Sequence, residues 1–121
     1  GWKRAYAPGS WAVTRGVRVP LVGRVSSDAL ALDVTHVPGF GPDDEILLIG
    51  SPASSDRATD GAGTGPAAAA PMTVHDLAAL RGSIAWEVLD DLTPRLSRVY
   101  VEGGQVVGVR YLDGVTRWVG D

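Results

Sequence analysis

The sequence has no cysteine, a single lysine and no long apolar run. Without cysteine, disulfides, thiolate catalysis and zinc–thiolate sites are excluded for these 121 residues. No stretch approaches the ~20 apolar residues of a membrane-spanning helix, and no signal peptide is recognisable, so we expect a cytoplasmic protein without membrane contact. The 11 basic side chains are scattered among 14 acidic ones, which predicts no nucleic-acid partner.

What is present is typical of one small domain. Hydrophobic residues make up 45% of the chain, enough to form one core at this length, so we predict a single domain over residues 1–121. Residue types that favour strands recur through the first half. Strands are predicted at 11–14, 17–21, 30–34 and, as a fully apolar strand, 45–50. Arg15-Gly16 predicts a turn, and Pro20 predicts an edge strand or a bend.

The middle of the chain changes character. Residues 51–71 contain no large apolar side chain and are rich in Gly, Ala and Ser, so we expect a flexible surface loop. Thr73, with Asp76 three positions later, predicts a helix N-cap close to a capping box. Gly82 is expected to end that helix. A second short helix is predicted from Ser83, with apolar side chains at four-residue spacing.

The last part of the chain is typical of β-hairpins. A strand is predicted at 98–101 and a hairpin over 104–119, with Asp113-Gly114 favouring a type I′ turn. Many short strands and one or two short helices predict an all-β fold, a small closed or nearly closed β-barrel.

Four ordered blocks resemble the C-terminal β-domain of alanine racemases. The strongest contains Gly23-Arg24-Val25-Ser26-Ser27-Asp28, similar to the family's Gly-Arg-Val-Ser-Met-Asp. The other blocks resemble the strand and turn that follow, the next strand with its acidic turn, and the closing helix and strand. They lie at 32–39, at 43–50, and at 82–87 together with 94–101.

The resemblance implies a domain that normally follows a TIM barrel carrying pyridoxal phosphate (PLP) on a lysine. In that family the enzyme is a head-to-tail homodimer that interconverts L-alanine and D-alanine, and so supplies D-alanine for the cell wall. The β-domain of one subunit closes the active site in the barrel of the other. Racemisation there uses two bases, the Schiff-base lysine and a tyrosine, on opposite faces of the substrate.

The isolated chain is predicted to lack this chemistry. Removing an α-proton needs the cofactor as an electron sink, and two opposed bases are needed to invert the centre. A TIM barrel usually takes ~250 residues, and the only lysine, Lys3, lies in the irregular first segment. The family's tyrosine base lies upstream of Gly1 in the resemblance. We therefore expect no catalytic residue and no cofactor in this chain alone.

Five positions are implied as site residues by the resemblance. Trp2 stands in place of an entryway tyrosine, and Ser27 replaces a methionine whose backbone helps position the substrate carboxylate. Arg24 and Asp28 keep the family's residue types. Trp86 replaces a tyrosine whose hydroxyl helps hold the cofactor phosphate; indole offers a single N–H instead. Either selection on this face has been lost, which the three altered positions favour, or a divergent barrel uses the altered face.

Structural roles remain open for the same residues. Asp28 is more typical of a turn than of a site, and most of the tryptophans are more typical of core packing. Arg24 is as typical of a structural ion pair or carbonyl clamp as of an anion site. The spacing of His36 and His75 does not indicate a metal site, and the acidic turn at 43–45 is more typical of a solvated surface than of a cation site.

The function predicted is that of the active-site-closing module of an alanine racemase-type protein with a degenerate active site. By itself it would be a non-catalytic binding or interaction domain. The alternative is an active racemase half that works only with a PLP-binding barrel from the same gene or from another chain. The expected partners are such a barrel or a second copy in a homodimer, because a surface freed of its barrel would be partly apolar.

Overall fold

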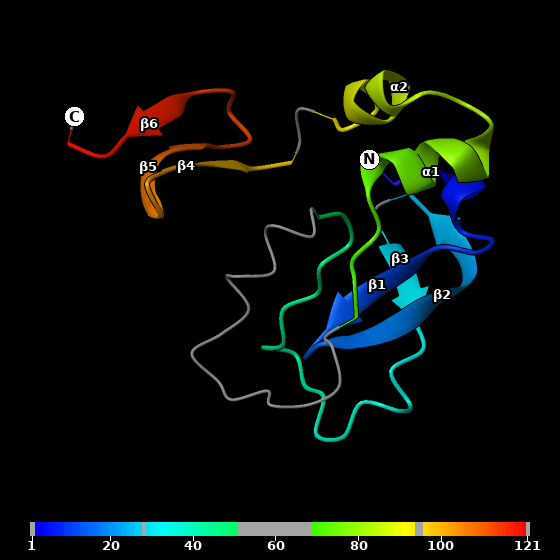
Figure 1. Cartoon of the computed structure of the whole chain (residues 1–121). Coiled ribbons are helices and arrows are strands. Elements are labelled where there is room, and N and C mark those ends of the chain that lie inside the picture. The colour runs from blue at the N-terminus through cyan, green and yellow to red at the C-terminus, as the bar shows by residue number, and fades with distance from the viewer. Residues whose placement is uncertain (1, 28, 51–68, 94–95, 121) are drawn as a thin grey trace. The chain divides into compact units, whose positions relative to one another are not determined.

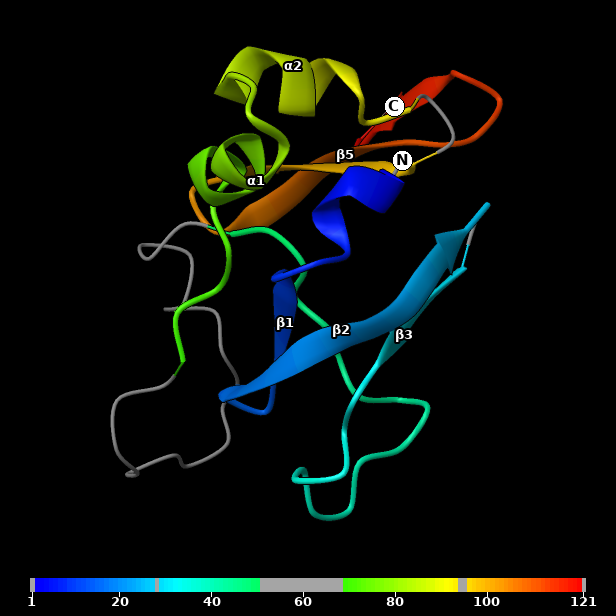
Figure 2. The same cartoon turned by 90° about the vertical axis from the view of Figure 1, so that its right-hand side faces the viewer.

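The computed structural model describes residues 2–27, 29–50, 69–93 and 96–120. These residues form two compact units, one from Trp2 to Leu89 and one from Asp90 to the C-terminus. Each unit is described by itself, with its elements labelled in Figure 1 and turned by 90° in Figure 2. The single domain over 1–121 stays a prediction. Residues 51–68 of the predicted flexible loop lie outside the described residues; at the loop's end, the N–H of Ala69 donates to the carbonyl of Gly16 at 3.0 Å.

The first unit is built on a three-stranded antiparallel sheet in the order β1-β2-β3. Its strands are β1 (Trp11–Thr14), β2 (Val17–Ser26) and β3 (Ala29–Leu32), and β2 is the long central strand in Figure 2. Pro20 lies inside β2, where pairing with β1 gives way to pairing with β3. It has no N–H to donate, and its carbonyl accepts from Asp33 at 3.0 Å. The prediction of an edge strand was therefore wrong for β2 as a whole.

The predicted turn at Arg15-Gly16 connects β1 to β2 as a two-residue hairpin loop. Thr14 pairs with Val17, and the φ angles of Arg15 and Gly16 are 49° and 74°. Two positive φ values are the signature of a type I′ turn, which suits the twist of the flanking strands. Arginine is strained in this conformation. Its guanidinium donates to Asp44 Oδ1 at 2.6 Å and to the carbonyl of Pro38 at 3.0 Å, which holds it there.

The apolar strand predicted at 45–50 does not form. Among the described residues, this segment makes one isolated bridge, in which Val13 and Leu47 exchange hydrogen bonds of 2.9 and 2.8 Å. The rest of the outer edge of β1 is used by side chains. The hydroxyl of Thr14 donates to the carbonyl of Glu45 at 2.8 Å, and the N–H of Trp11 donates to the sulfur of Met72 at 3.3 Å. Because these two bonds occupy both ends of the four-residue strand β1, residues 45–50 pair with it only through the bridge at Val13.

Two apolar clusters form the core of the first unit. The smaller one, Ala12, Val19 and Val37, covers the β1–β2 sheet. The larger one is formed by the short 3₁₀ helix η1 (Arg4–Tyr6), by Met72 and by two α-helices. Its buried members are Tyr6, Met72, Leu77, Ala78 and Val88. Burial of such side chains contributes roughly 1.5–3 kcal/mol each, so this cluster fixes the helices on η1.

Helix α1 (Val74–Arg81) begins and ends where the sequence predicts. The N–H of Asp76 donates to the hydroxyl of Thr73 at 3.2 Å, and the N–H of Thr73 donates to the Asp76 carboxylate at 2.7 Å, which completes a capping box. Gly82 ends the helix at φ 68°. Helix α2 (Ala85–Asp90) follows directly and buries Val88. Neither helix is long and apolar enough to cross a membrane, and the same holds for the other described residues.

The C-terminal unit is a second antiparallel sheet, in the order β4-β5-β6. Its strands are β4 (Arg98–Glu102), β5 (Gln105–Arg110) and β6 (Thr116–Trp118). Tyr100, Gly108 and Trp118 lie in register across the three strands, and the two rings are 5.4 Å apart. A Cβ on Gly108 would come within 2.5 Å of the Trp118 ring. Glycine is therefore required here, because the indole lies directly against the strand.

The turn between β5 and β6 differs from the predicted type I′ turn at Asp113-Gly114. Tyr111 and Val115 are hydrogen-bonded at 3.2 Å, which leaves a three-residue loop. Gly114 has φ 79°, and Asp113 is not among the described residues with positive φ. This is a type I turn that ends in a left-handed glycine. The Asp113 carboxylate accepts from the N–H of Val115 at 2.8 Å and stabilises the longer loop.

The described chain is thus mostly β, with two sheets and few helices. The strand pairings of the described residues form two separate three-stranded sheets and show no closed barrel. The closed or nearly closed barrel stays a prediction.

Candidate functional site

Arg24 lies on a bulged segment of β2. Between Val22 and Ser26 the register with β3 shifts, and Gly23 adopts φ 69°. A bulge of this kind bends a strand and re-aims the side chains next to it. Arg24 is exposed.

Ser27 stands in the tight connection between β2 and β3. Ser26 pairs with Ala29, so the connection consists of residues 27 and 28; Asp28 lies outside the described residues. Ser27 has φ 45°, one of two positive values found for described non-glycine residues. Backbone strain of this kind costs of order 1–3 kcal/mol and gathers at functional sites. A two-residue hairpin connection also accounts for a positive φ, as it does at Arg15.

Trp2 is part of the core packing. Its ring meets that of Tyr6 edge-on, with centroids 5.4 Å apart, and packs against the larger apolar cluster. Its indole N–H is buried and has no hydrogen-bond partner within the described residues. This environment favours the structural role for Trp2 over an entryway role.

The segment that carries Trp2 docks beside Arg24. The Nε of Arg4, in η1, donates to the carbonyl of Val25 at 3.1 Å. This bond links the first residues of the chain to the bulged part of β2. The bond is the described link between η1 and β2, whereas Trp2 itself packs on Tyr6 and the larger apolar cluster.

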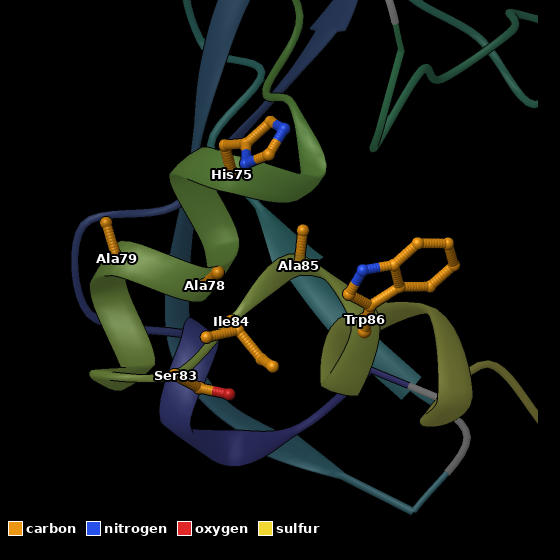
Figure 3. A pocket seen from close by; sticks show the side chains of 7 residues that line it. All are labelled: His75, Ala78, Ala79, Ser83, Ile84, Ala85 and Trp86. Carbon is orange, nitrogen blue, oxygen red and sulfur yellow. The ribbon is translucent and has the colours of Figure 1, made fainter.

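Trp86 projects from α2 and is 73% exposed. It lines an open pocket of about 490 Å³ between the two helices, shown in Figure 3. Sequence reasoning did not find the other residues of this pocket: His75, Ala78 and Ala79 on α1, Ser83 and Ile84 in the connection, and Ala85 at the start of α2. The spacing of the three α1 residues, i, i+3 and i+4, puts them on one helix face and could have indicated them.

The polar groups near Trp86 are engaged with a carboxylate. The hydroxyl of Ser83 donates to the Glu87 carboxylate, and Arg81 Nη2 lies 3.8 Å from Glu87 Oε2. The remaining lining consists of the His75 imidazole and of aliphatic side chains, among which Ile84 is 60% exposed. The pocket therefore suits apolar groups.

Metal ligation and acid–base chemistry find no support among the described residues. No group of three or more His, Asp or Glu side chains is placed to hold a metal ion in that part of the chain. Asp44, in the acidic turn, pairs with Arg15, and the hydrogen bond from this guanidinium holds the pKa of the Asp44 carboxyl below its ordinary value. A hydrogen bond from the Thr35 hydroxyl lowers the pKa of Asp33 in the same way. Both carboxylates have local structural roles.

Comparison with known proteins identifies the family. The family model described as alanine racemase, C-terminal domain, matches residues 1–67. The alanine racemase of Sorangium cellulosum is 37% identical over 91 residues, 75% of this chain and 21% of that protein. The alanine racemase of Desulfovibrio desulfuricans is 32% identical over 102 residues, 84% of this chain and 23% of that protein.

Solved structures of alanine racemases also resemble this chain. Alanine racemase from Bacillus anthracis with bound L-Ala-P matches with a TM-score of 0.65 and 25% identity, over 90% of this chain and 24% of that one. Alanine racemase from Clostridium difficile 630 matches with a TM-score of 0.69 and 20% identity over 92% and 25%, and this second likeness shows the fold alone. The chain spans a quarter or less of the length of these relatives. It belongs to the family of alanine racemase C-terminal domains.

Proposed function

We propose that this chain is the module of an alanine racemase-type protein that docks on a PLP-binding barrel and closes its active site, and that by itself it does not racemise alanine. The observation that supports the proposal is the small share of its relatives' length that this chain matches. The family match and the structural likeness account for most of this chain but for only 21–25% of its relatives. The active site of the whole relative must draw on residues outside the matched part.

Lys3 supports the absence of catalysis by the isolated chain. It is the only lysine, it is exposed, and it precedes η1 as the N-cap residue. A Schiff-base lysine needs a pocket that excludes water and orients the cofactor. Lys3 does not line the pocket described above.

The residues around Trp86 do not fit the phosphate of PLP. An anion site needs cations or N–H and O–H donors directed at it. Of the polar side chains that line this pocket, the hydroxyl of Ser83 is bound to Glu87, whose negative charge would repel a phosphate, and His75 supplies one imidazole. Trp86 offers one indole N–H in place of a hydroxyl. No step through PLP is therefore assigned to this chain.

The barrel-facing surface is proposed to include Arg24, Ser27, Asp28 and Trp86. The exposed guanidinium, the strained Ser27 backbone and the exposed indole support such a contact. The altered residue types support a degenerate face. Closure of the strands into a barrel and a cytoplasmic location belong to the same proposal.

A racemase half that becomes active on a barrel is the second candidate, because Arg24 keeps the family's residue type and is exposed. The two are separated by mixing the purified chain with a barrel fragment of an alanine racemase and PLP, and measuring D-alanine formed from L-alanine. We expect binding to the fragment with activity at background. Activity that appears only in the mixture would establish the second candidate.

Three variants sharpen the test: Trp86→Tyr, Arg24→Ala and Trp86→Ala. Trp86→Tyr restores a hydroxyl at the exposed position and should not affect folding, because the side chain is 73% exposed. Arg24→Ala should weaken binding to the fragment if β2 faces the barrel. Unchanged binding in Arg24→Ala and in Trp86→Ala would contradict the proposed docking face.

A further inference from the structure

The bulge of β2 interrupts the pairing of this strand within the described part of the sheet. Between the paired positions Val22 and Ser26, residues 23–25 face a single residue of β3. The pairing with β1 involves the first part of β2. A surplus of two residues preserves the alternation of a strand, so Val25 stays on the inner face, where it is 5% exposed. The backbone of the bulge therefore needs partners other than the neighbouring strands.

Arg4 supplies such a partner. Its Nε donates to the carbonyl of Val25 at 3.1 Å. The carbonyl of a buried residue needs a donor, because burial removes its hydrogen bonds to water. Hydrogen bonds from a charged guanidinium are stronger than those between neutral groups. The conformation of the bulge thus depends on a side chain that lies 21 residues earlier in the sequence.

The short helix η1, which carries Arg4, is also fixed to the two α-helices. Its last residue, Tyr6, is buried in the larger apolar cluster together with Val88 of α2. Figure 2 shows η1, in blue, between the two helices and the sheet of the first unit. Val88 lies two residues after Trp86 on the same helix. One short helix therefore connects the strand segment that carries Arg24 to the helix that carries Trp86.

We propose that Arg4 is a positioning residue, whose bond to Val25 fixes the bulge of β2 and so holds Arg24 in a set arrangement relative to Trp86. Arg24 and Trp86 belong to the barrel-facing surface proposed above, and the consequence for docking rests on that proposed function. The effect on the bulge itself does not. A surface whose parts are held in place before contact binds more tightly, because less conformational freedom is lost on binding.

Two substitutions separate the hydrogen bond from the charge. Arg4→Gln places an amide N–H at the same number of bonds from Cα as the Arg4 Nε, without the charge. Arg4→Met has a methyl group at that position and offers no donor. Arg18→Met is the matched control, because it removes another guanidinium from the same unit, one that lies 4.0 Å from the centre of the Trp11 ring. Arg4 and Arg18 are both exposed, so the variants should fold, which circular dichroism checks.

Backbone amide order parameters of the full chain, from ¹⁵N relaxation, report on the bulge. Residues 23–26 should be rigid, at about 0.85, in the wild type, Arg4→Gln and Arg18→Met, and should fall toward about 0.6 in Arg4→Met. The carbonyl ¹³C shift of Val25 should change in Arg4→Met, because its donor is lost. Order parameters in Arg4→Met equal to those of the wild type overturn the proposal. So does an Arg4→Gln variant as mobile as Arg4→Met.

Binding to a barrel fragment of an alanine racemase tests the consequence for docking. Arg4→Met should weaken binding about fivefold, and Arg4→Gln should stay within about twofold of the wild type. Arg24→Ala should weaken binding less in the Arg4→Met background than in the wild type, because a guanidinium that is not held contributes less. A wild type that does not bind contradicts the proposed function, and the order parameters still decide the role of Arg4. A mobile bulge with unchanged binding overturns the consequence for docking.

Discussion

The two units of this chain bury their apolar residues very differently. In the first unit Tyr6, Met72 and Leu77 are at most 2% exposed. In the described part of the second unit the only buried residue is Gly108, while Leu112 and Val119 are 69% and 71% exposed. The first unit therefore has a core of its own. The second is a three-stranded sheet organised by one row of aromatic rings over a glycine, which is close to the limit of independent stability.

The difference explains where partners are expected. A unit with a filled core can present a site on its surface without losing its fold. A sheet with an exposed apolar face gains stability when that face or its edge is covered. The following substitutions test whether the stability of each unit depends on the contacts described above.

Leu77→Ala should have the largest effect. Leu77 is fully buried in the larger cluster, and truncating such a residue costs about 2–5 kcal/mol of unfolding free energy. Leu80→Ala is the matched control on the same helix, since Leu80 is 39% exposed, and should cost less than half as much. Urea unfolding followed by circular dichroism measures both. Equal losses would mean that α1 is not fixed by this cluster.

Gly108→Ala should destabilise the second unit by about 1–3 kcal/mol, because the added methyl group overlaps the Trp118 ring. Amide hydrogen exchange should accelerate in β4, β5 and β6 and stay unchanged in α1. Gly41→Ala, where an added Cβ meets open space, is the control. Faster exchange in α1 as well would show that the two units unfold together.

Thr73→Ala should cost about 1 kcal/mol through loss of the capping box. The N–H and hydroxyl of Thr73 hold the pKa of the Asp76 carboxyl below its ordinary value. A carboxyl with a lowered folded pKa stabilises the fold above its unfolded pKa, and this contribution is lost as the pH falls through the folded value. Unfolding curves between about pH 2 and 7 should show this loss in the wild type and less of it in Thr73→Ala. Because the alanine variant keeps the backbone N–H, an identical pH dependence would exclude the Thr73 hydroxyl as a source of this loss.

Arg15→Asn should have the smallest effect, within about 0.5 kcal/mol. Asparagine tolerates the positive φ of this turn, which offsets the loss of an exposed ion pair. The pKa of Asp44, followed by NMR titration, should rise because its main stabilising donor is removed. Arg15→Val should cost more than Arg15→Asn, because a β-branched residue is strained at positive φ and this strain adds to the loss of the ion pair. A pKa of Asp44 that does not rise would contradict the role given to Arg15.

Local signals in the sequence were sufficient where the structure depends on near neighbours. Thr73, Asp76 and Gly82 define α1 because a cap is satisfied within four residues. The type I′ turn was assigned to Asp113-Gly114 but occurs at Arg15-Gly16. Arg15 tolerates it through Asp44 and Pro38, more than 20 residues away, and no local rule contains such partners.

Contacts between residues distant in the sequence also decide the conformation of residues 45–50 and the surroundings of Trp86 and Trp2. The apolar run at 45–50 has the composition of a strand, but its pairing depends on the length of β1 and on what occupies that edge. Resemblance pointed to Trp86, whereas the pocket around it depends on how α1 and α2 meet. The packed environment of Trp2 depends in turn on Tyr6 and the distant Met72 cluster.

The most direct test of the account is whether the purified 121-residue chain, supplied with PLP, exchanges the α-hydrogen of L-alanine with solvent deuterium. Proton NMR in D₂O follows this exchange without requiring full inversion. The account predicts a rate equal to that of PLP alone. Exchange well above that rate, with cofactor found covalently attached to Lys3 after borohydride reduction, would contradict it.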